Sequence, residues 1–179
     1  MLPRDLWGGA IRADVPSTMV DCSALRDLPD NQEMWADEAT GHSLILELLQ
    51  RQDDVSDTDA PQWHFCNYVL ENTDTLPTIR SLETILGGGT ITIGTMEAAK
   101  FREAARNTVL VVQLLVRLPP PASTDLLVSY NAPLVLHAES SESRAVTSVS
   151  STPLDEASIR TAVCAIATSL HVVDSSLFC

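Results

Sequence analysis

The stretch NTVLVVQLLVRLPPPASTDLLVSYNAP, residues 107–133, decides the fold of this chain. Its first part is long and nearly all apolar, which is typical of a central strand buried on both faces. Its last ten residues predict a second strand. Only the rigid connector PPPAS, residues 119–123, separates the two. Because a crossover helix does not fit into so short a connection, we expect antiparallel strands.

Four further strands are predicted outside this pair. They are residues 8–16, 32–37, 62–70 and 90–101, the third because it is aromatic and alternating. Residues 73–89 stay ambiguous, since TIRSLETIL is compatible with one or two helical turns ahead of the glycines.

Two helices are predicted. Within residues 40–54, Leu44 and Leu48 repeat at the four-residue spacing of an apolar helix face. The second helix covers residues 155–170, where apolar residues recur at helical spacing. It begins with Asp155, at the end where the helix dipole favours an acid.

These elements predict an α+β fold, with a largely antiparallel sheet of about six strands and helices packed on it. The chain has 179 residues, no internal repeat and no change of composition. We therefore expect a single domain over residues 1–179. The serine-rich residues 139–152 predict a mobile loop within it.

The charge of the chain is strongly acidic, with 24 acidic against 11 basic residues and a net charge of −13. Thirteen of the acids lie in the first 60 residues, together with only four basic residues. An acidic surface repels phosphate groups, so binding to nucleic acid or to anionic membranes is disfavoured. A basic protein surface is the natural partner, and the alternative is that the charge only maintains solubility.

Signatures of catalysis or of cofactor binding are missing from the sequence. LGGGT, residues 86–90, lacks the Lys-Ser/Thr of a phosphate-binding loop and predicts a glycine turn. His64 and Cys66 would share one side of the predicted strand, but a structural zinc site needs four ligands. No metal and no cofactor is predicted, and a Ser-His-Asp site built from distant residues remains a low-ranked alternative.

The stretch RDLPDNQEMW, residues 26–35, places the carboxylates of Asp30 and Glu33 three residues apart. A helix capping box is one interpretation, but the residues that follow alternate like a strand. A catalytic acid pair needs a cleft that the sequence does not indicate. An acidic contact patch at an exposed edge, beside the anchoring aromatic Trp35, is the economical functional interpretation, and a solvated turn is its rival.

Five stretches, in this order and spacing, resemble a known family. They are LWGGAI (residues 6–11), LRDLPDNQE (25–33), SLILELLQ (43–50, in the predicted first helix), TDLLVSYNAP (124–133) and HVVDSSLF (171–178). The chain resembles the Ran guanine nucleotide release factors, the Mog family of nuclear import proteins. The resemblance implies an antiparallel sheet between helices in three layers, which is also the fold of the photosystem PsbP proteins.

The resemblance also implies a function: binding the small GTPase Ran, promoting release of its guanine nucleotide and supporting nuclear protein import, without covalent chemistry. We expect a monomer. The sequence shows no signal region and no membrane span, which indicates an intracellular protein. A domain of this size diffuses through nuclear pores, so we expect it in both nucleus and cytoplasm.

In the family, the two acids of the P-D-x-Q-E stretch lie in the Ran-binding surface, and they fall on Asp30 and Glu33 here. Neighbouring surface or support is assigned by the same resemblance to Arg26, Pro29, Asn31, Gln32 and Trp35. The runner-up function is a protein-interaction scaffold with the same fold and a different basic partner. A small hydrolase ranks below both.

Overall fold

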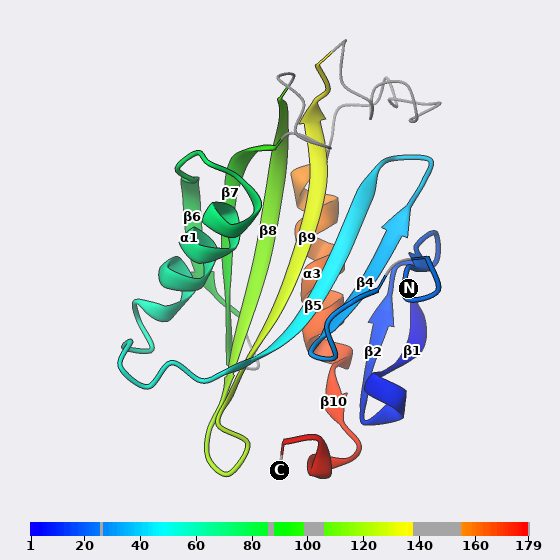
Figure 1. Ribbon diagram of the computed structural model, residues 1–179, viewed down its shortest axis with the longest axis vertical. Helices are drawn as coiled ribbons and strands as arrows, with labels where there is room; N and C mark the ends of the chain where they lie inside the picture. Colours follow the sequence, from blue (N-terminus) through cyan, green and yellow to red (C-terminus); the bar gives the residue numbers. More distant parts are fainter. Residues whose placement is uncertain (26, 86–87, 99–105, 138–154, 179) are drawn as a thin grey trace.

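The main feature of the computed structural model is an antiparallel sheet of seven strands (Figure 1). The structure describes residues 1–25, 27–85, 88–98, 106–137 and 155–178. In spatial order the sheet consists of β3 (Val20–Asp21), β4 (Gln32–Asp37), β5 (His42–Gln50), β9 (Thr124–Val135), β8 (Asn107–Leu118), β7 (Gly89–Ala98) and β6 (Thr78–Thr84). Every pair of neighbours in it is antiparallel.

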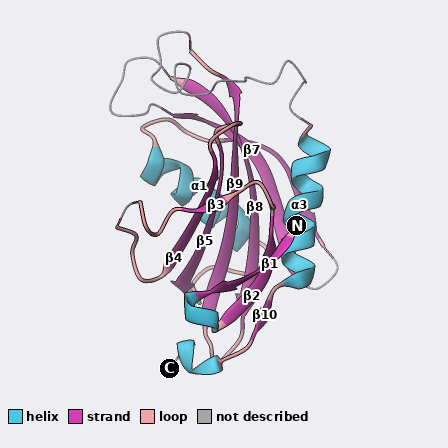
Figure 2. Ribbon diagram, turned by 90° about the vertical axis from the view of Figure 1, so that its right-hand side faces the viewer, coloured by secondary structure: helices cyan, strands magenta, loops and turns pink. Residues whose placement is uncertain are grey.

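Helices cover the sheet on both faces, which gives three layers (Figure 2). The helix α1 (Ala60–Asn72) lies on one face, and α3 (Glu156–Ser169) lies on the other. Beside α3 is a small sheet of β1 (Leu2–Leu6), β2 (Ile11–Val15) and β10 (His171–Val172). Single turns of 3-10 helix occupy Trp7–Gly9 and Ser175–Phe178. The predicted α+β fold with its largely antiparallel sheet and helix layers is confirmed.

The two strands predicted to decide the fold are neighbours at the centre of the sheet. They pair through eleven residue positions, with Val112 opposite Tyr130. In β8, seven consecutive residues from Val109 to Leu115 are buried, so both faces of the strand are covered. The predicted strand at 32–37 is confirmed as β4, and the predicted C-terminal helix as α3. The predicted strand at 8–16 contains β2, but its first two residues belong to the 3-10 turn. Of the predicted strand at 90–101, residues 90–98 lie in β7 and the rest lies outside the described residues.

The predicted helix over residues 40–54 is wrong, because this segment forms β5. Leu44 and Leu46 point to the α3 side and are fully buried, while Ile45 and Glu47 point to the α1 side. A strand covered on both faces has apolar residues on both, so it also satisfies a four-residue spacing. The β1 strand and the small sheet to which it belongs were not predicted.

The predicted strand over residues 62–70 is also wrong, because these residues lie in α1. The buried residues of the helix follow a helical period and are Ala60, Pro61, His64, Phe65, Tyr68 and Val69. Pro61 lies in the first turn, where a missing N–H costs nothing. The aromatic content of the segment suggested a strand, but packing on one helix face decides its structure. The ambiguous segment 73–89 contains β6, and residues 139–152 lie outside the described part of the chain.

The strand β6 forms one edge of the seven-stranded sheet and is mostly exposed. Two of its charged side chains form ion pairs with side chains of α3, which packs on the sheet. Arg80 donates to Glu156 at 2.6 Å, and Glu83 accepts from Arg160. The edge strand is therefore tied to the helix by charges of both signs.

A small apolar core holds α1 on the sheet. Its buried side chains are Phe65, Tyr68, Val69, Met96, Val109 and Val111. Gly94 in β7 leaves the space that this packing needs. A Cβ at Gly94 would lie 2.7 Å from Cζ of Phe65 and 2.5 Å from the carbonyl oxygen of Thr78. Only glycine permits so close an approach of helix to strand.

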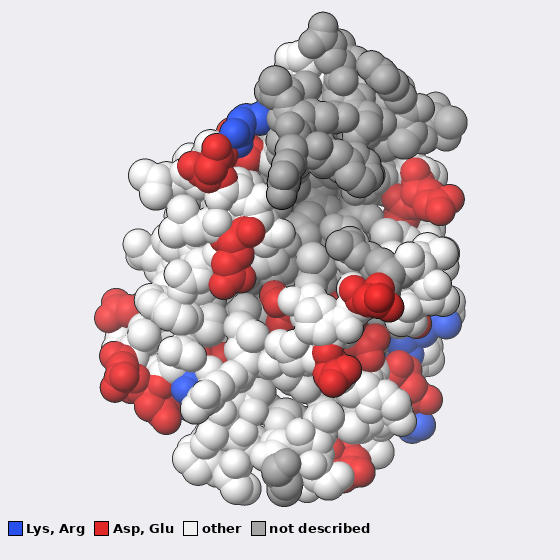
Figure 3. Space-filling model, viewed as in Figure 1, with Lys and Arg blue, Asp and Glu red and all other residues white. Residues whose placement is uncertain are grey.

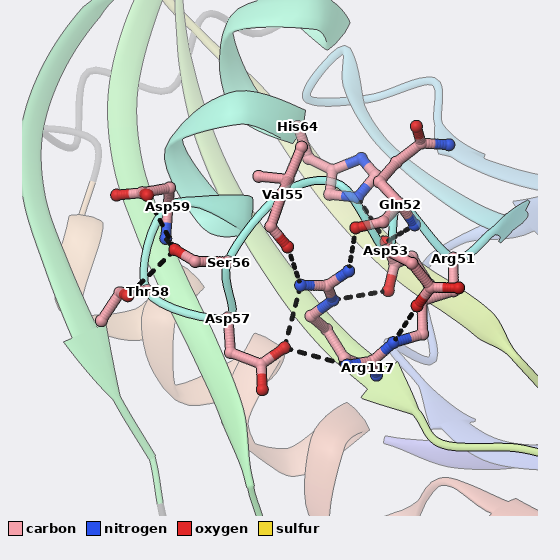
Figure 4. Close-up of polar contacts among 11 residues, drawn as sticks. Arg51, Gln52, Asp53, Val55, Ser56, Asp57, Thr58, Asp59, His64 and Arg117 are labelled. Carbon is pink, nitrogen blue, oxygen red and sulfur yellow. Dashed lines mark hydrogen bonds and ion pairs between the residues drawn. The ribbon is translucent and has the colours of Figure 1, made fainter.

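The start of α1 is fixed by a buried carboxylate, that of Asp125 at the beginning of β9. Figure 4 shows His64, Gln52 and Arg117, which are its partners. The Asp125 side chain is fully buried. His64 Nε2 lies 2.9 Å from one carboxylate oxygen, and the Gln52 backbone N–H donates to the same oxygen at 3.1 Å. Arg117 Nε donates to the other oxygen at 2.9 Å. Asp125 therefore joins the helix, the preceding loop and the centre of the sheet.

Arg117 extends the network into the acidic loop between β5 and α1. Its terminal nitrogens donate to the carbonyl oxygens of Val55 at 2.9 Å and Gln52 at 2.6 Å, and to Asp57 at 2.9 Å. Burial by itself would raise the pKa of Asp125, but the hydrogen bonds from His64, Gln52 and Arg117 hold it below its ordinary value. The stability that this ionised carboxylate contributes is present above the unfolded pKa of about 3.9 and is lost as pH falls through the folded pKa.

We predict that Arg117→Met lowers the free energy of unfolding by about 3 kcal/mol, because Asp125 then keeps a buried charge without its guanidinium partner. Arg12→Met is the matched control. Arg12 forms an ion pair with Asp5, and the two side chains are 53% and 60% exposed. It should change the free energy by less than about 1 kcal/mol. Urea unfolding at pH 7 measures both. Equal effects would show that the Asp125 network does not hold α1 in place.

Candidate functional site

The turn that carries Asp30 is anchored to β5 through Asn31. The backbone N–H of Gln32 donates to the Pro29 carbonyl at 2.9 Å and closes the turn. The backbone carbonyl of Asn31 accepts a hydrogen bond from the Leu48 N–H at 2.9 Å. The side-chain amide of Asn31 donates to the Leu48 carbonyl at 3.1 Å. A turn followed by an extended strand is what the sequence predicted, and the capping-box interpretation is excluded.

The two acids of the turn have different environments. Asp30 is exposed, as predicted. Glu33 is half-buried, which corrects the expectation of an exposed position, and its carboxylate accepts a hydrogen bond of 2.6 Å from the Trp7 backbone N–H. Glu33 therefore links the large sheet to the turn that follows β1.

The environment of Glu33 disfavours its charge. Burial raises the pKa of Glu33, the hydrogen bond from Trp7 lowers it in part, and the nearby charge of Asp21 raises it again. The net pKa lies above the ordinary value for a glutamate. Maintaining this charge at neutral pH therefore costs the protein stability.

Trp35 does not form the anchoring aromatic of an exposed patch. It is 5% exposed, belongs to the main core, and has Arg4 Cζ 5.2 Å from its ring centroid. The sequence did not show this, because the small sheet that buries Trp35 comes from distant segments. Trp35 supports the fold around Glu33, and Arg26 lies outside the described residues.

A groove of about 480 Å³ lies on the α1 face of the sheet, next to this turn. It is lined by α1, by the segment before the turn, by β4 and β5, and by the strands β7, β8 and β9. Its lining includes Asp27, Pro29, Gln32, Met34, Ile45, Glu47, Tyr68, Glu71, Met96 and Asn131. Gln32 faces this groove, whereas its neighbour Glu33 lies toward the small sheet.

On the face seen in Figure 3, acidic side chains are the more widespread charged groups among the described residues, and the basic ones among these lie toward its margins. Within the groove, Glu47 is 8% exposed and accepts a hydrogen bond of 2.7 Å from Gln32. Burial raises the pKa of Glu47, the hydrogen bond from Gln32 lowers it in part, and the charge of Glu71 raises it. This face is therefore suited to cationic groups.

The other candidate sites of the sequence do not assemble. His64 and Cys66 lie on a helix, two residues apart, so they do not share one side as they would on a strand. His64 and Asp125 form a buried pair, and no serine hydroxyl among the described residues hydrogen-bonds to it. A hydrolytic triad is therefore not built around this pair in the part of the chain that the structure describes.

Of the glycines of LGGGT, Gly88 lies in the connection between β6 and β7 and Gly89 begins β7, as the turn interpretation predicted, whereas residues 86–87 lie outside the described part of the chain. Ile85 N–H donates to the Gly89 carbonyl at 2.9 Å, and Gly88 has a φ of 89°. Among the described residues, no group of three or more His, Cys, Asp or Glu side chains could hold a metal ion. A search of the same residues finds no helix of the length and apolar character that crossing a bilayer requires.

The sequence analysis missed the groove, because six separate segments line it. One signal was available: Glu47 interrupts the apolar run LILELLQ. An acid in the middle of a buried strand is unusual and often marks a functional position. The assignment of this run to a helix hid the signal, because on a helix Glu47 would have pointed to solvent.

Comparisons with known proteins agree on one family. Residues 4–133 match the family model described as Ran-interacting Mog1 protein. The Ran guanine nucleotide release factor of Danio rerio is 37% identical over 152 residues, which cover 78% of this chain and 82% of that protein. The nuclear import protein MOG1 of Saccharomyces cerevisiae is 29% identical over 187 residues, which cover 97% and 83%.

Solved structures show the same fold. The 1.9 Å crystal structure of the Saccharomyces cerevisiae Ran-binding protein Mog1p superposes with a TM-score of 0.75 at 26% identity, covering 99% of this chain and 97% of that one. A Mog1 variant in which one glutamate is replaced by alanine superposes with a TM-score of 0.70 at 24% identity. The layers described above are thus those of a known fold.

We predict that Glu33→Ala is less stable than Glu33→Gln by about 1–2 kcal/mol, because only the glutamine keeps an acceptor for the Trp7 N–H. Urea unfolding of both variants at pH 7 measures this difference. Equal stabilities would contradict the importance of the Glu33–Trp7 hydrogen bond.

The same two proteins, wild type and Glu33→Gln, should respond differently to pH. Because the folded pKa of Glu33 is raised, wild type loses stability as pH rises from the unfolded value of about 4.3 through the folded pKa. The glutamine variant has no such loss. We expect its stability relative to wild type to increase between pH 4 and pH 7, measured as urea midpoints, and a constant difference would contradict the raised pKa.

Proposed function

Since its residues 4–133 match the Mog1 family model and close relatives cover most of it, the chain belongs to the Mog1 family, and we propose that it binds the GTPase Ran. Through this binding it promotes release of guanine nucleotide from Ran and supports nuclear protein import. The observation that carries the proposal is the match of sequence and fold to proteins named for these roles.

Asp30 and Glu33 are the proposed contact residues for Ran. Asp30 is exposed on a turn that Asn31 ties to β5, so its position is fixed before binding. The surrounding face is acidic, which would steer a basic surface of Ran toward it. Pro29, Gln32 and Trp35 are assigned to supporting or bordering this contact.

The unfavourable environment of Glu33 supports a role in binding. Its raised pKa shows that the folded chain loses stability by keeping this carboxylate charged. A charged side chain kept in an environment that disfavours its charge is characteristic of functional positions. A cation of the partner beside Glu33 would recover part of that cost.

Release of nucleotide requires that the chain bind nucleotide-free Ran more tightly than loaded Ran, because equal affinity shifts no equilibrium. A carboxylate that competes for the lysine or the magnesium holding the phosphates would provide this difference. Asp30 is the candidate, because Glu33 is already engaged with Trp7.

The proposed role is that of a regulator which binds and performs no covalent step. It acts as a monomer, in nucleus and cytoplasm, and the acidic face does not suit nucleic acid or anionic membranes. The alternative partner for the same face is another basic protein, in which case the chain is a scaffold.

We predict that wild type accelerates release of a fluorescent guanine nucleotide from Ran, and that Asp30→Asn/Glu33→Gln reduces this acceleration about tenfold by removing two contact charges. The matched control is Glu38→Gln/Asp54→Asn, which removes the same charge from two exposed acids outside the site. It should behave like wild type.

Circular dichroism and urea unfolding verify that both double variants are folded. Stable binding of Ran without release would favour the scaffold alternative. Lack of binding even at low salt, where charge attraction is strongest, would overturn the proposed function.

A further inference from the structure

The groove between α1 and the strands β4 and β5 combines an acidic wall with an apolar floor. Three acidic residues line it, and they come from three different elements. Asp27 belongs to the segment before β4, Glu47 to β5 and Glu71 to α1. None of its lining residues in the described chain is a lysine or an arginine. Among the described residues, the lining therefore contains acids without a basic side chain to balance their charge.

Glu47 is the most buried of the three acids that line this groove. It is 8% exposed, so most of its hydration is removed. One of its carboxylate oxygens accepts from Gln32 at 2.7 Å, and its other oxygen accepts no hydrogen bond from the described residues. Tyr68, which also lines the groove, donates its hydroxyl hydrogen to Asn131 at 3.0 Å. The second oxygen is not among the buried, unpaired side-chain atoms of the described residues, so it is accessible from the groove, where it can accept a charge-assisted hydrogen bond from a bound cation.

The floor of the groove is apolar and adaptable. Met34, Ile45 and Met96 line it. Methionine side chains adjust to the shape of what they contact. Lysine and arginine bury their methylene stems on such surfaces while the charged end meets a polar group.

We propose that this groove binds a lysine or arginine side chain of the GTPase partner, with its stem on Met34 and Met96 and its charged end at Glu47 and Glu71. The inference rests on the proposed function and extends it, because it adds a second contact to the Asp30 turn. The two regions are continuous: Pro29 and Gln32, on either side of Asp30 and Asn31, line the groove.

Charge complementarity identifies the occupant. An anionic ligand or a nucleic acid would be repelled by three carboxylates. A second copy of this chain carries the same net charge of −13 and would also be repelled. A cationic side chain from a basic protein surface satisfies the open acceptor of Glu47 and the apolar floor together.

Calorimetric titration of Ran into variants of the full chain tests the groove. Glu47→Gln keeps the size of the side chain and removes its charge, and we expect Kd for Ran to rise about tenfold. Asp54→Asn is the matched control: it removes one exposed acid in the loop before α1 and should leave Kd unchanged.

Methionine methyl NMR gives a second, direct readout. Met34 and Met96 line the groove, whereas Met19 is buried in the main core. With Ran added to wild type, we expect the methyl signals of Met34 and Met96 to shift and that of Met19 to stay. Each signal is assigned by a Met→Leu variant.

The outcomes separate this inference from the proposed function. If Ran binds wild type and Glu47→Gln with equal affinity, and the Met34 and Met96 signals do not move, the groove proposal is overturned while Ran binding stands. If Ran does not bind wild type at all, both proposals are overturned.

Discussion

The position of α1 depends on one buried carboxylate, that of Asp125. Helix, loop and central strand converge on it through His64, Gln52 and Arg117. Such a charge is tolerated in the interior only because it is fully paired. Since α1 forms one side of the groove through Tyr68 and Glu71, a network at the start of the helix determines the geometry of a surface near its other end.

The centre of the sheet was predictable from sequence, and its two flanking elements were not. In residues 107–133, long apolar strands and a five-residue connector leave one arrangement. For β5 and α1, local pattern was insufficient. Leu44 and Leu48 satisfy a helical spacing in a strand covered on both faces, and Trp63 and Phe65 suggest a strand in a segment whose burial is helical. In both cases tertiary packing overrides local preference.

The candidate site was predictable to the extent that it is local. The turn at Asp30 and the strand after it were deduced from Pro29 and Asn31. The hydrogen bond from Trp7 to Glu33 spans 26 positions, and the burial of Trp35 depends on the small sheet. The sequence pattern contains neither, because both arise from contacts between distant segments.

The ion pairs between β6 and α3 bear on how an open sheet avoids self-association. A free sheet edge exposes backbone groups that template the addition of foreign strands, which leads to aggregation. Here Arg80 and Glu83 place opposite charges along that rim, each held by a partner on α3. An incoming strand would have to displace or desolvate these charges. The ion pairs therefore protect this edge against the addition of further strands, independently of what they contribute to the stability of the fold.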